Sequence, residues 1–332
     1  MPTAEGGAII DPVSTRRRDL DVDAQRRAGQ AVADTRAVGG FFYAHLAGIR
    51  GGVPEAGTAS LTIAPEPGQV GGSSTMALAT LADVALGTAL RSRRSPGQLL
   101  PTTDLTLTLM RPSSGQVTAL ARVLHLDAGG GTASCELADD AGVVGYASGT
   151  FAAQPVRPGS SLPVTPWEVG MPARQDRDPD RAPQPGELTP AEQACVQAVV
   201  SAALRAGATA AAFGDELLDL MTSQIGQGRS LGSAHVTPAL ANRSGTVQGG
   251  ALLALAAASA APLLPSARWE LRTITYAFLR PATGTDLEAA ATLRRQGRTS
   301  AVLSVDVSSQ GADIGLAILR FAPPVAASRA SA

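Results

Sequence analysis

One acidic side chain stands inside an otherwise apolar segment. Residues 75–92 predict a long buried helix, and within it Asp83 is flanked by Leu81, Leu86 and Gly87. Asp83 lies two turns into that helix, beyond the reach of helix capping. A carboxylate held there is partly desolvated, which makes it a candidate general base or nucleophile. The alternative is that Asp83 simply points to solvent.

A glycine-rich loop precedes the second apolar helix, which we expect at about 249–262. The loop runs from Asn242 through Gln248 to Gly249 and Gly250. Glycines at the start of a helix allow close approach of a ligand, and the free N–H groups of the first turn bind developing negative charge. The alternative is an ordinary connecting loop.

The composition excludes several kinds of chemistry. All 27 basic residues are Arg, so a Schiff-base lysine and a P-loop lysine are excluded. Three His and two Cys give no closed zinc site and no disulfide framework, and we expect neither a metal nor a resident cofactor. The formal net charge of -1 and the 3% of aromatic residues argue against a nucleic-acid partner.

Nothing in the chain predicts a membrane segment. The start of the sequence is polar and rich in Arg and Asp, with no apolar run typical of a secretory signal. The most apolar run, 249–264, has 16 residues and contains Pro262, so it is too short to span a bilayer. We expect a cytoplasmic protein with no membrane partner.

The elements that must position these residues occur twice in the chain. Strand-like segments ending in Arg-Pro lie at 104–112 and 273–281, at an offset of 169 residues. The two apolar helices match at an offset of 174. Around them each half predicts one strand, the helix and then three or four strands that alternate in polarity. The expected strands lie at about 58–64, 101–111, 116–126, 132–139 and 143–152 in the first half, and at 231–238, 269–280, 285–295, 299–308 and 312–321 in the second.

The repeat predicts an α+β protein of two joined, pseudo-symmetric units. In each unit a curved antiparallel sheet wraps around the long helix, and the units pair edge to edge, which removes an exposed edge strand from each. Each unit has a helical lead-in, at about 20–47 and 189–221. We therefore expect an N-terminal unit at 1–152, a Pro-rich linker at 153–188, a C-terminal unit at 189–323 and a flexible tail at 324–332.

The spacing of these residues resembles a known family. The pattern Asn-x5-His-Gly-Gly-x6-Asp, followed by a strand that ends in Arg-Pro, is similar to that of the PaaI-like hotdog-fold acyl-CoA thioesterases. The resemblance covers about 55–152 and 228–322 and implies a double-hotdog form. It also implies that a site forms between two hotdog units, where one supplies the Asn, the His or Gln and the glycine N–H, and the other supplies the helix Asp and a Ser or Thr.

Each half keeps a different part of this pattern. The second half has Asn242, Gln248 in place of His, and the Gly249–Gly250 pair, but Ala257 and Leu271 stand where the Asp and the Ser or Thr belong. The first half keeps Asp83 and has Thr102 at the Ser or Thr position. Its loop has lost the pattern, with Gly68, Ser74 and Thr75–Met76 at the corresponding positions. One complete composite site remains.

The resemblance implies that the protein hydrolyses an acyl-CoA to the free acid and CoA, at one site per chain. The Gly249 N–H would stabilise the oxyanion, Asp83 would attack the carbonyl carbon or activate water, and Thr102 would orient the water or the carboxylate. Asn242 and Gln248 would hold the loop or the substrate carbonyl. For the CoA moiety we expect contacts from Gly250 and from the arginines around a predicted turn, Arg294, Arg295 and Arg298. The alternative for these arginines is a solvated hairpin tip.

Two other functions stay open. The chain could bind or sense acyl-CoA without turnover, which the Gln248 replacement and the degenerate second site allow. A hotdog hydratase or dehydratase needs an Asp and a His together in one unit, and the scarcity of His argues against it. Because hotdog proteins often pair again, we also expect a homo-oligomer of double-hotdog chains.

Overall fold

The computed structural model describes residues 12–38, 42–67, 72–94, 98–156, 165, 182–209, 211–266 and 268–324. Most of the predicted linker, all but the first residue of the predicted tail, and Gly68 lie outside the described residues. Among the described parts, no helix is both long and apolar enough to cross a membrane.

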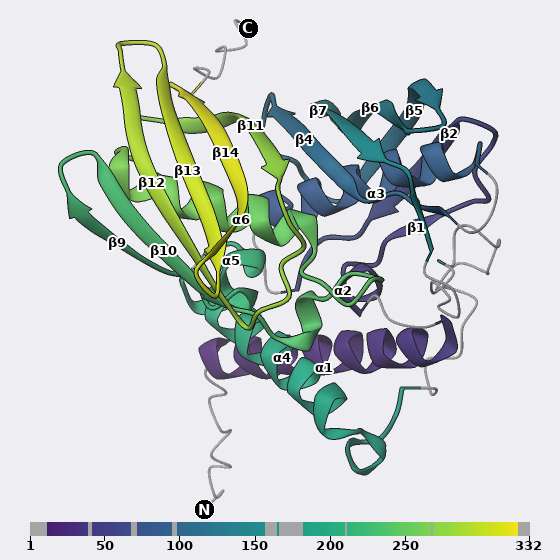
Figure 1. Cartoon of the computed structure of the whole chain (residues 1–332). Coiled ribbons are helices and arrows are strands. Elements are labelled where there is room, and N and C mark those ends of the chain that lie inside the picture. The colour runs from purple at the N-terminus through teal and green to yellow at the C-terminus, as the bar shows by residue number, and fades with distance from the viewer. Residues whose placement is uncertain are drawn as a thin grey trace, which may run out of the picture.

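A single antiparallel sheet of twelve strands forms the body of the molecule, in the order β1-β2-β5-β6-β7-β4-β11-β14-β13-β12-β10-β9 (Figure 1). In the first half the strands are β1 (Arg50–Gly51), β2 (Thr58–Ile63), β4 (Thr102–Leu109), β5 (Val117–Asp127), β6 (Gly130–Asp139) and β7 (Gly142–Ala152). In the second half they are β9 (Met221–Gly226), β10 (Arg229–His235), β11 (Glu270–Phe278), β12 (Asp286–Gln296), β13 (Ala301–Ser309) and β14 (Ala312–Ala322). A separate two-stranded sheet pairs β3 (Gln98–Leu99) with β8 (Gln154–Pro155).

The two halves meet where β4 pairs with β11. The pairing is antiparallel, and its central pair is Thr106 with Thr275, whose hydroxyl oxygens lie 3.0 Å apart. These two residues differ by 169 in number, which is the offset between the Arg-Pro strands in the sequence repeat. Repeat-equivalent residues therefore face each other, and a pseudo-twofold axis passes through this point of the seam.

One long helix lies against the sheet in each half, as Figure 1 shows: α3 (Thr75–Arg91) against the first-half strands and α6 (Gly249–Ala260) against the second. Helix α3 begins at Thr75 because the Ser74 hydroxyl accepts the Ala77 N–H at 3.1 Å, a regular N-cap. Helix α6 ends one residue before Ala261–Pro262, since a proline removes a helical hydrogen bond and clashes with the preceding turn. Each half is thus a sheet around a central helix, as the repeat predicts, and the pair corresponds to the double-hotdog form that the family resemblance implies.

The central helices pack directly on one another between the two halves. A Cβ on Gly250 would overlap the Thr80 hydroxyl and lie 2.6 Å from the Met76 carbonyl oxygen. Only glycine permits this approach of α6 to α3. The start of α6 is therefore held against the middle of α3, near Asp83.

The predicted lead-ins form a helical layer on the other side of the central helices (Figure 1). They are α1 (Pro12–Val38) and α2 (Phe42–Leu46) in the first half, and α4 (Pro190–Thr209) and α5 (Phe213–Leu217) in the second. Helices α1 and α4 pack together, and Arg36 forms a salt bridge of 2.7 Å with Glu192. Within the described parts of the chain, 3-10 helices of a single turn lie at Pro185–Glu187, Pro238–Leu240 and Ala261–Leu263.

The strands β1, β3, β8 and β9 were not predicted. All six residues of β9 are exposed. Because neither face of this edge strand is buried, its sequence lacks the alternation of apolar and polar residues that identifies the other strands. The other three are two residues long and form through pairing rather than through any local pattern.

Candidate active site

A cavity of about 480 Å³ lies between the two halves. The first half contributes Asp83, Val84 and Arg91 from α3, residues 99–103 and Phe151. The second half contributes most of the 242–249 loop and residues 278–282 at the end of β11. Neither half alone could enclose this space.

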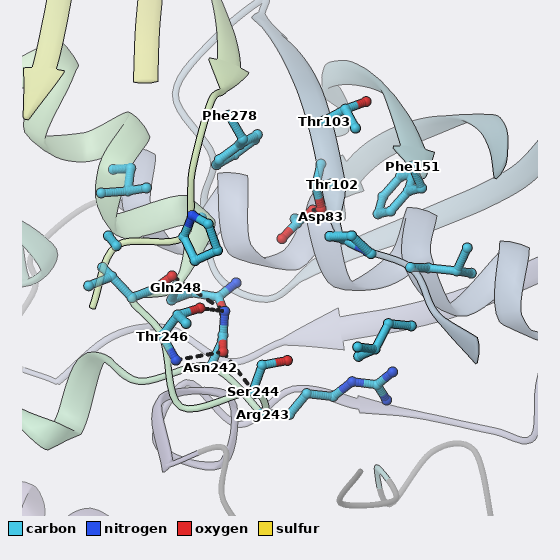
Figure 2. A pocket seen from close by; sticks show the side chains of 18 of the residues that line it. Asp83, Thr102, Thr103, Phe151, Asn242, Arg243, Ser244, Thr246, Gln248 and Phe278 are labelled. Atoms are coloured by element: carbon cyan, nitrogen blue, oxygen red, sulfur yellow. Dashed lines mark hydrogen bonds between the residues drawn. The ribbon is translucent and has the colours of Figure 1, made fainter. Parts of the chain in front are cut away.

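Asp83 and Thr102 form the centre of the site (Figure 2). The Thr102 hydroxyl donates a hydrogen bond of 2.7 Å to Asp83 Oδ1. Burial raises the pKa of Asp83 above its usual value, while this hydrogen bond and the positive charge of Arg91 lower it in part. Asp83 is therefore a partly desolvated carboxylate that faces the cavity, and it does not point to open solvent.

The other oxygen of Asp83 lies beside the start of α6. A Cβ on Gly249 would be 3.3 Å from Asp83 Oδ2 and 3.2 Å from Phe278 Cζ, so any side chain here would fill the space between them. Gly249 is the first residue of α6, and the N–H groups of a first helical turn have no partner within the helix. The start of α6 and the Asp83 carboxylate, which come from different halves, thus lie beside the same small volume.

Asn242 shapes the loop that leads to Gly249. Its Oδ1 accepts the N–H groups of Ser244 (2.8 Å) and Thr246 (3.2 Å), and its Nδ2 donates to Thr246 Oγ1 (2.8 Å). Figure 2 shows these bonds on the floor of the cavity. The side chain lines the cavity, but most of its hydrogen bonds fix the loop, which favours the loop-holding role among the two that the sequence suggested.

Gln248 takes the N-cap position of α6 and is 2% exposed. Its backbone N–H donates to the Leu240 carbonyl at 2.9 Å, and its side chain makes no capping hydrogen bond. The residue lines the cavity together with Gly249. The five residues predicted as catalytic therefore all line one cavity.

The residues predicted to contact CoA are located elsewhere. Gly250 is packed against α3 and does not line the cavity. Arg294 donates to Ser304 on the neighbouring strand at 2.7 Å, and Arg295 and Arg298 are exposed near the β12–β13 turn. Ala301, which follows this turn, pairs with Phe321 on β14, and Phe321 pairs in turn with Leu271 on β11. The turn therefore lies at the end of the sheet where β11 starts.

The cavity lies at the opposite end of β11, at Phe278. Seven residues of strand separate Phe278 from Leu271, a distance of roughly 23 Å. The sequence showed that Arg294, Arg295 and Arg298 share a turn, but not at which end of the sheet the turn would lie.

Three arginines that the sequence analysis did not assign to the site line the cavity: Arg91, Arg243 and Arg280. Arg280 is the arginine of the Arg-Pro pair that ends the second strand-like segment of the repeat. Two signals were available: Arg243 directly follows Asn242, and Arg91 lies eight residues after Asp83, on the same face of a helix. Among the described residues no three His, Cys, Asp or Glu side chains are grouped so that they could hold a metal ion.

The pseudo-symmetric counterpart of the Gly249 position is the start of α3. At the start of α3 the Glu66 carboxylate accepts the Ser74 N–H at 2.8 Å and the Ser74 hydroxyl at 3.0 Å. Burial raises the pKa of Glu66 to about 7. Ala257 and Leu271 supply no polar group opposite, so this location lacks the paired donor and carboxylate of the first cavity.

The second half of the chain matches a known family model, and the chain as a whole resembles a solved structure. Residues 237–322 match the model of the acyl-CoA thioesterase N-terminal domain family. A putative oleoyl thioesterase from Lactobacillus plantarum is 12% identical, with a TM-score of 0.50 over 82% of this chain and 98% of its own.

Two further solved structures each cover less than half of the chain. The BH2602 protein from Bacillus halodurans, solved with CoA, is 19% identical, with a TM-score of 0.38 over 42% of this chain and 97% of its own. The Escherichia coli PaaI protein is 23% identical, with a TM-score of 0.32 over 33% and 83%. No curated protein sequence matches the chain. The chain is thus a tandem hotdog protein whose second half matches an acyl-CoA thioesterase domain.

Proposed function

We propose that the protein hydrolyses an acyl-CoA thioester to the free acid and CoA, at one composite site per chain. The observation that carries the proposal is the position of Asp83 Oδ2, 3.3 Å from where a Cβ would stand on Gly249 at the start of α6. The match of residues 237–322 to a thioesterase domain supports the same reaction class.

The chemistry follows from this juxtaposition. The thioester carbonyl oxygen accepts the Gly249 N–H, which stabilises the negative charge that develops on it. Asp83 takes a proton from a water molecule, the water oxygen bonds to the carbonyl carbon, and the C–S bond breaks as the sulfur takes up a proton. Direct attack by the Asp83 carboxylate, followed by hydrolysis of the resulting anhydride, gives the same products. Thr102 holds the carboxylate in either case.

The exposed rim of the second half suits the CoA moiety. Arg280 and Ser244 are exposed there, and Arg243 lies beside Ser244. CoA carries phosphates, and guanidinium groups bind phosphate through paired hydrogen bonds. We therefore assign the CoA side of the cavity to Arg243 and Arg280, in place of Arg294, Arg295 and Arg298.

The test is the release of free CoA thiol from a panel of acyl-CoAs by the wild type and by Asp83→Asn. Loss of the base lowers kcat by about 10²–10⁴-fold. The exposed Asp306 on β13 provides a matched control, and Asp306→Asn should keep full activity. A loss of less than tenfold in Asp83→Asn would rule out Asp83 as the base or nucleophile. Tight binding of acyl-CoA by a wild type that hydrolyses none of the panel would favour the binding or sensing function instead.

A further inference from the structure

The cavity contains a cation that hydrolysis of a simple acyl chain does not require. Helix α3 carries Asp83, Gly87 and Arg91 at intervals of four residues, so the three lie along one face of the helix. Asp83 and Arg91 both line the cavity. The carboxylate and the guanidinium therefore belong to the same enclosed space.

Gly87 determines where the guanidinium lies. A Cβ on Gly87 would be 2.8 Å from Arg91 Nη1 and 3.4 Å from Phe151 Cε1. Long side chains on a helix lean toward its N-terminus, and the Arg91 side chain does so over the space that Gly87 leaves. Glycine is the least favourable residue inside a helix after proline, so this position gives up helix propensity for that space.

The position of the guanidinium sets the distance between the Asp83 end of the cavity and the positive charge of Arg91. One turn of helix separates Gly87 from Asp83, which is roughly 6 Å for four residues. The Arg91 Nη2 donates to the Thr88 hydroxyl at 3.1 Å, which holds one edge of the guanidinium group. Its charge is close enough to lower the pKa of Asp83.

The surroundings of Arg91 distinguish the two ends of the cavity. Phe151, at 2% exposure, and the half-buried Leu99 line this end, whereas Ser244 and Arg280 at the other end are exposed. With the phosphates of CoA at the exposed end, the acyl group extends from Gly249 past Asp83 toward Gly87. It then meets the positive charge of Arg91 beside the ring of Phe151.

We propose that Arg91 binds a carboxylate at the far end of the acyl group, so that the preferred substrates are CoA thioesters of short dicarboxylic acids. This inference rests on the proposed function. The step of roughly 6 Å along α3 matches a chain of about two or three methylene groups between the thioester carbon and the distal carboxylate. A monocarboxylic chain of equal length leaves the guanidinium without that partner.

The test compares succinyl-CoA and glutaryl-CoA with butyryl-CoA and valeryl-CoA, which have the same chain lengths without the charge. The wild type should show the higher kcat/KM on the dicarboxylic pair. Arg91→Met should lower the ratio of kcat/KM on the dicarboxylic pair to kcat/KM on the monocarboxylic pair by roughly 10- to 100-fold, because a hydrogen bond between charged groups is lost. The effect of the lost charge on Asp83 acts on both pairs alike and cancels in this ratio. The exposed Arg122 on β5 gives the matched control Arg122→Met, which should leave the ratio unchanged.

Gly87→Ala provides a second variant that keeps the charge but displaces the guanidinium. It should shift the dicarboxylic-to-monocarboxylic ratio in the same direction without lowering the melting temperature, since Ala favours the helix. Equal kcat/KM on the two pairs in the wild type, or an unchanged ratio in both variants, would overturn the inference and leave the thioesterase proposal standing. A mere influence of Arg91 on Asp83 would shift the pH profile equally for both pairs and leave their ratio unchanged.

Failure of the thioesterase proposal is recognised separately. If the wild type hydrolyses no acyl-CoA, calorimetry with non-hydrolysable thioethers of CoA still measures whether the protein prefers ligands with a distal carboxylate. Tighter binding of the S-carboxyalkyl than of the S-alkyl thioether, lost in Arg91→Met, would support the role of Arg91. Equal binding of the two thioethers would overturn it.

Discussion

Replacing Thr102 by Val tests whether the ionisation of Asp83 controls the reaction. The Thr102 hydroxyl donates to Asp83 Oδ1 at 2.7 Å and thereby lowers a pKa that burial has raised. Val has nearly the same shape but cannot donate this bond. A hydrogen bond to a charged group contributes about 1.5–3 kcal/mol, and one pKa unit corresponds to about 1.4 kcal/mol. Loss of the bond should therefore disfavour the charged form of Asp83 and raise its pKa further.

The assay is the pH dependence of kcat/KM, followed by thiol release. The proposed mechanism requires the charged carboxylate, so kcat/KM should fall as the pH drops through the pKa of Asp83. In Thr102→Val this acid limb should move to higher pH. The matched control is Thr106→Val on the same strand, whose hydroxyl contacts Thr275 and does not line the cavity. An acid limb that stays in place in Thr102→Val, or that moves equally in Thr106→Val, would refute the reasoning.

Two further predictions concern stability. The folded protein holds a proton on Glu66 up to a pH of about 7, above the ordinary value of 4.5, so its contribution to stability is present at low pH and is lost as the pH rises between these values. Urea unfolding at pH 5 and pH 8 should show Glu66→Gln removing up to about 3 kcal/mol of this pH dependence; identical profiles for variant and wild type would contradict it. Gly250→Ala should lower the unfolding free energy by about 1–3 kcal/mol, because its Cβ would overlap Thr80. Thermal unfolding should show no such loss in Gly226→Ala, where a Cβ meets no atom within 4 Å, and equal losses would refute the packing argument.

The repeat made most of the fold predictable. Apolar alternation identified ten of the strands, and the two long helices begin at Thr75 and Gly249, as the sequence predicted. The offset of 169 residues even corresponds to the central pair of the seam, Thr106 with Thr275. What the pattern could not show was β9, because an edge strand that is exposed on both faces is under no pressure to alternate.

The site was predictable only where its residues carry a spacing signal. Asp83 and Gly249 could be paired from the sequence because each keeps one part of a pattern that the other half has lost. The spacing of eight residues places Arg91 on the helix face of Asp83, but the position of its guanidinium depends on the missing side chain of Gly87 and on the direction in which a helical side chain leans. The turn with Arg295 was misplaced for a related reason: local sequence does not indicate which end of a sheet a hairpin reaches.

The register of the β4–β11 pairing can affect the proposed activity without affecting the stability of the fold. A slip of the two strands by two residues would keep the same faces inward and preserve both hydrophobic cores. It would nevertheless carry Asp83 and Gly249, which belong to opposite sides of the seam, roughly 7 Å relative to each other. Such a protein could be stable, cooperative and inert. The proposed activity therefore depends on the alignment of two sheets as well as on the residues of the cavity, and the backbone pairing of β4 with β11 holds that alignment.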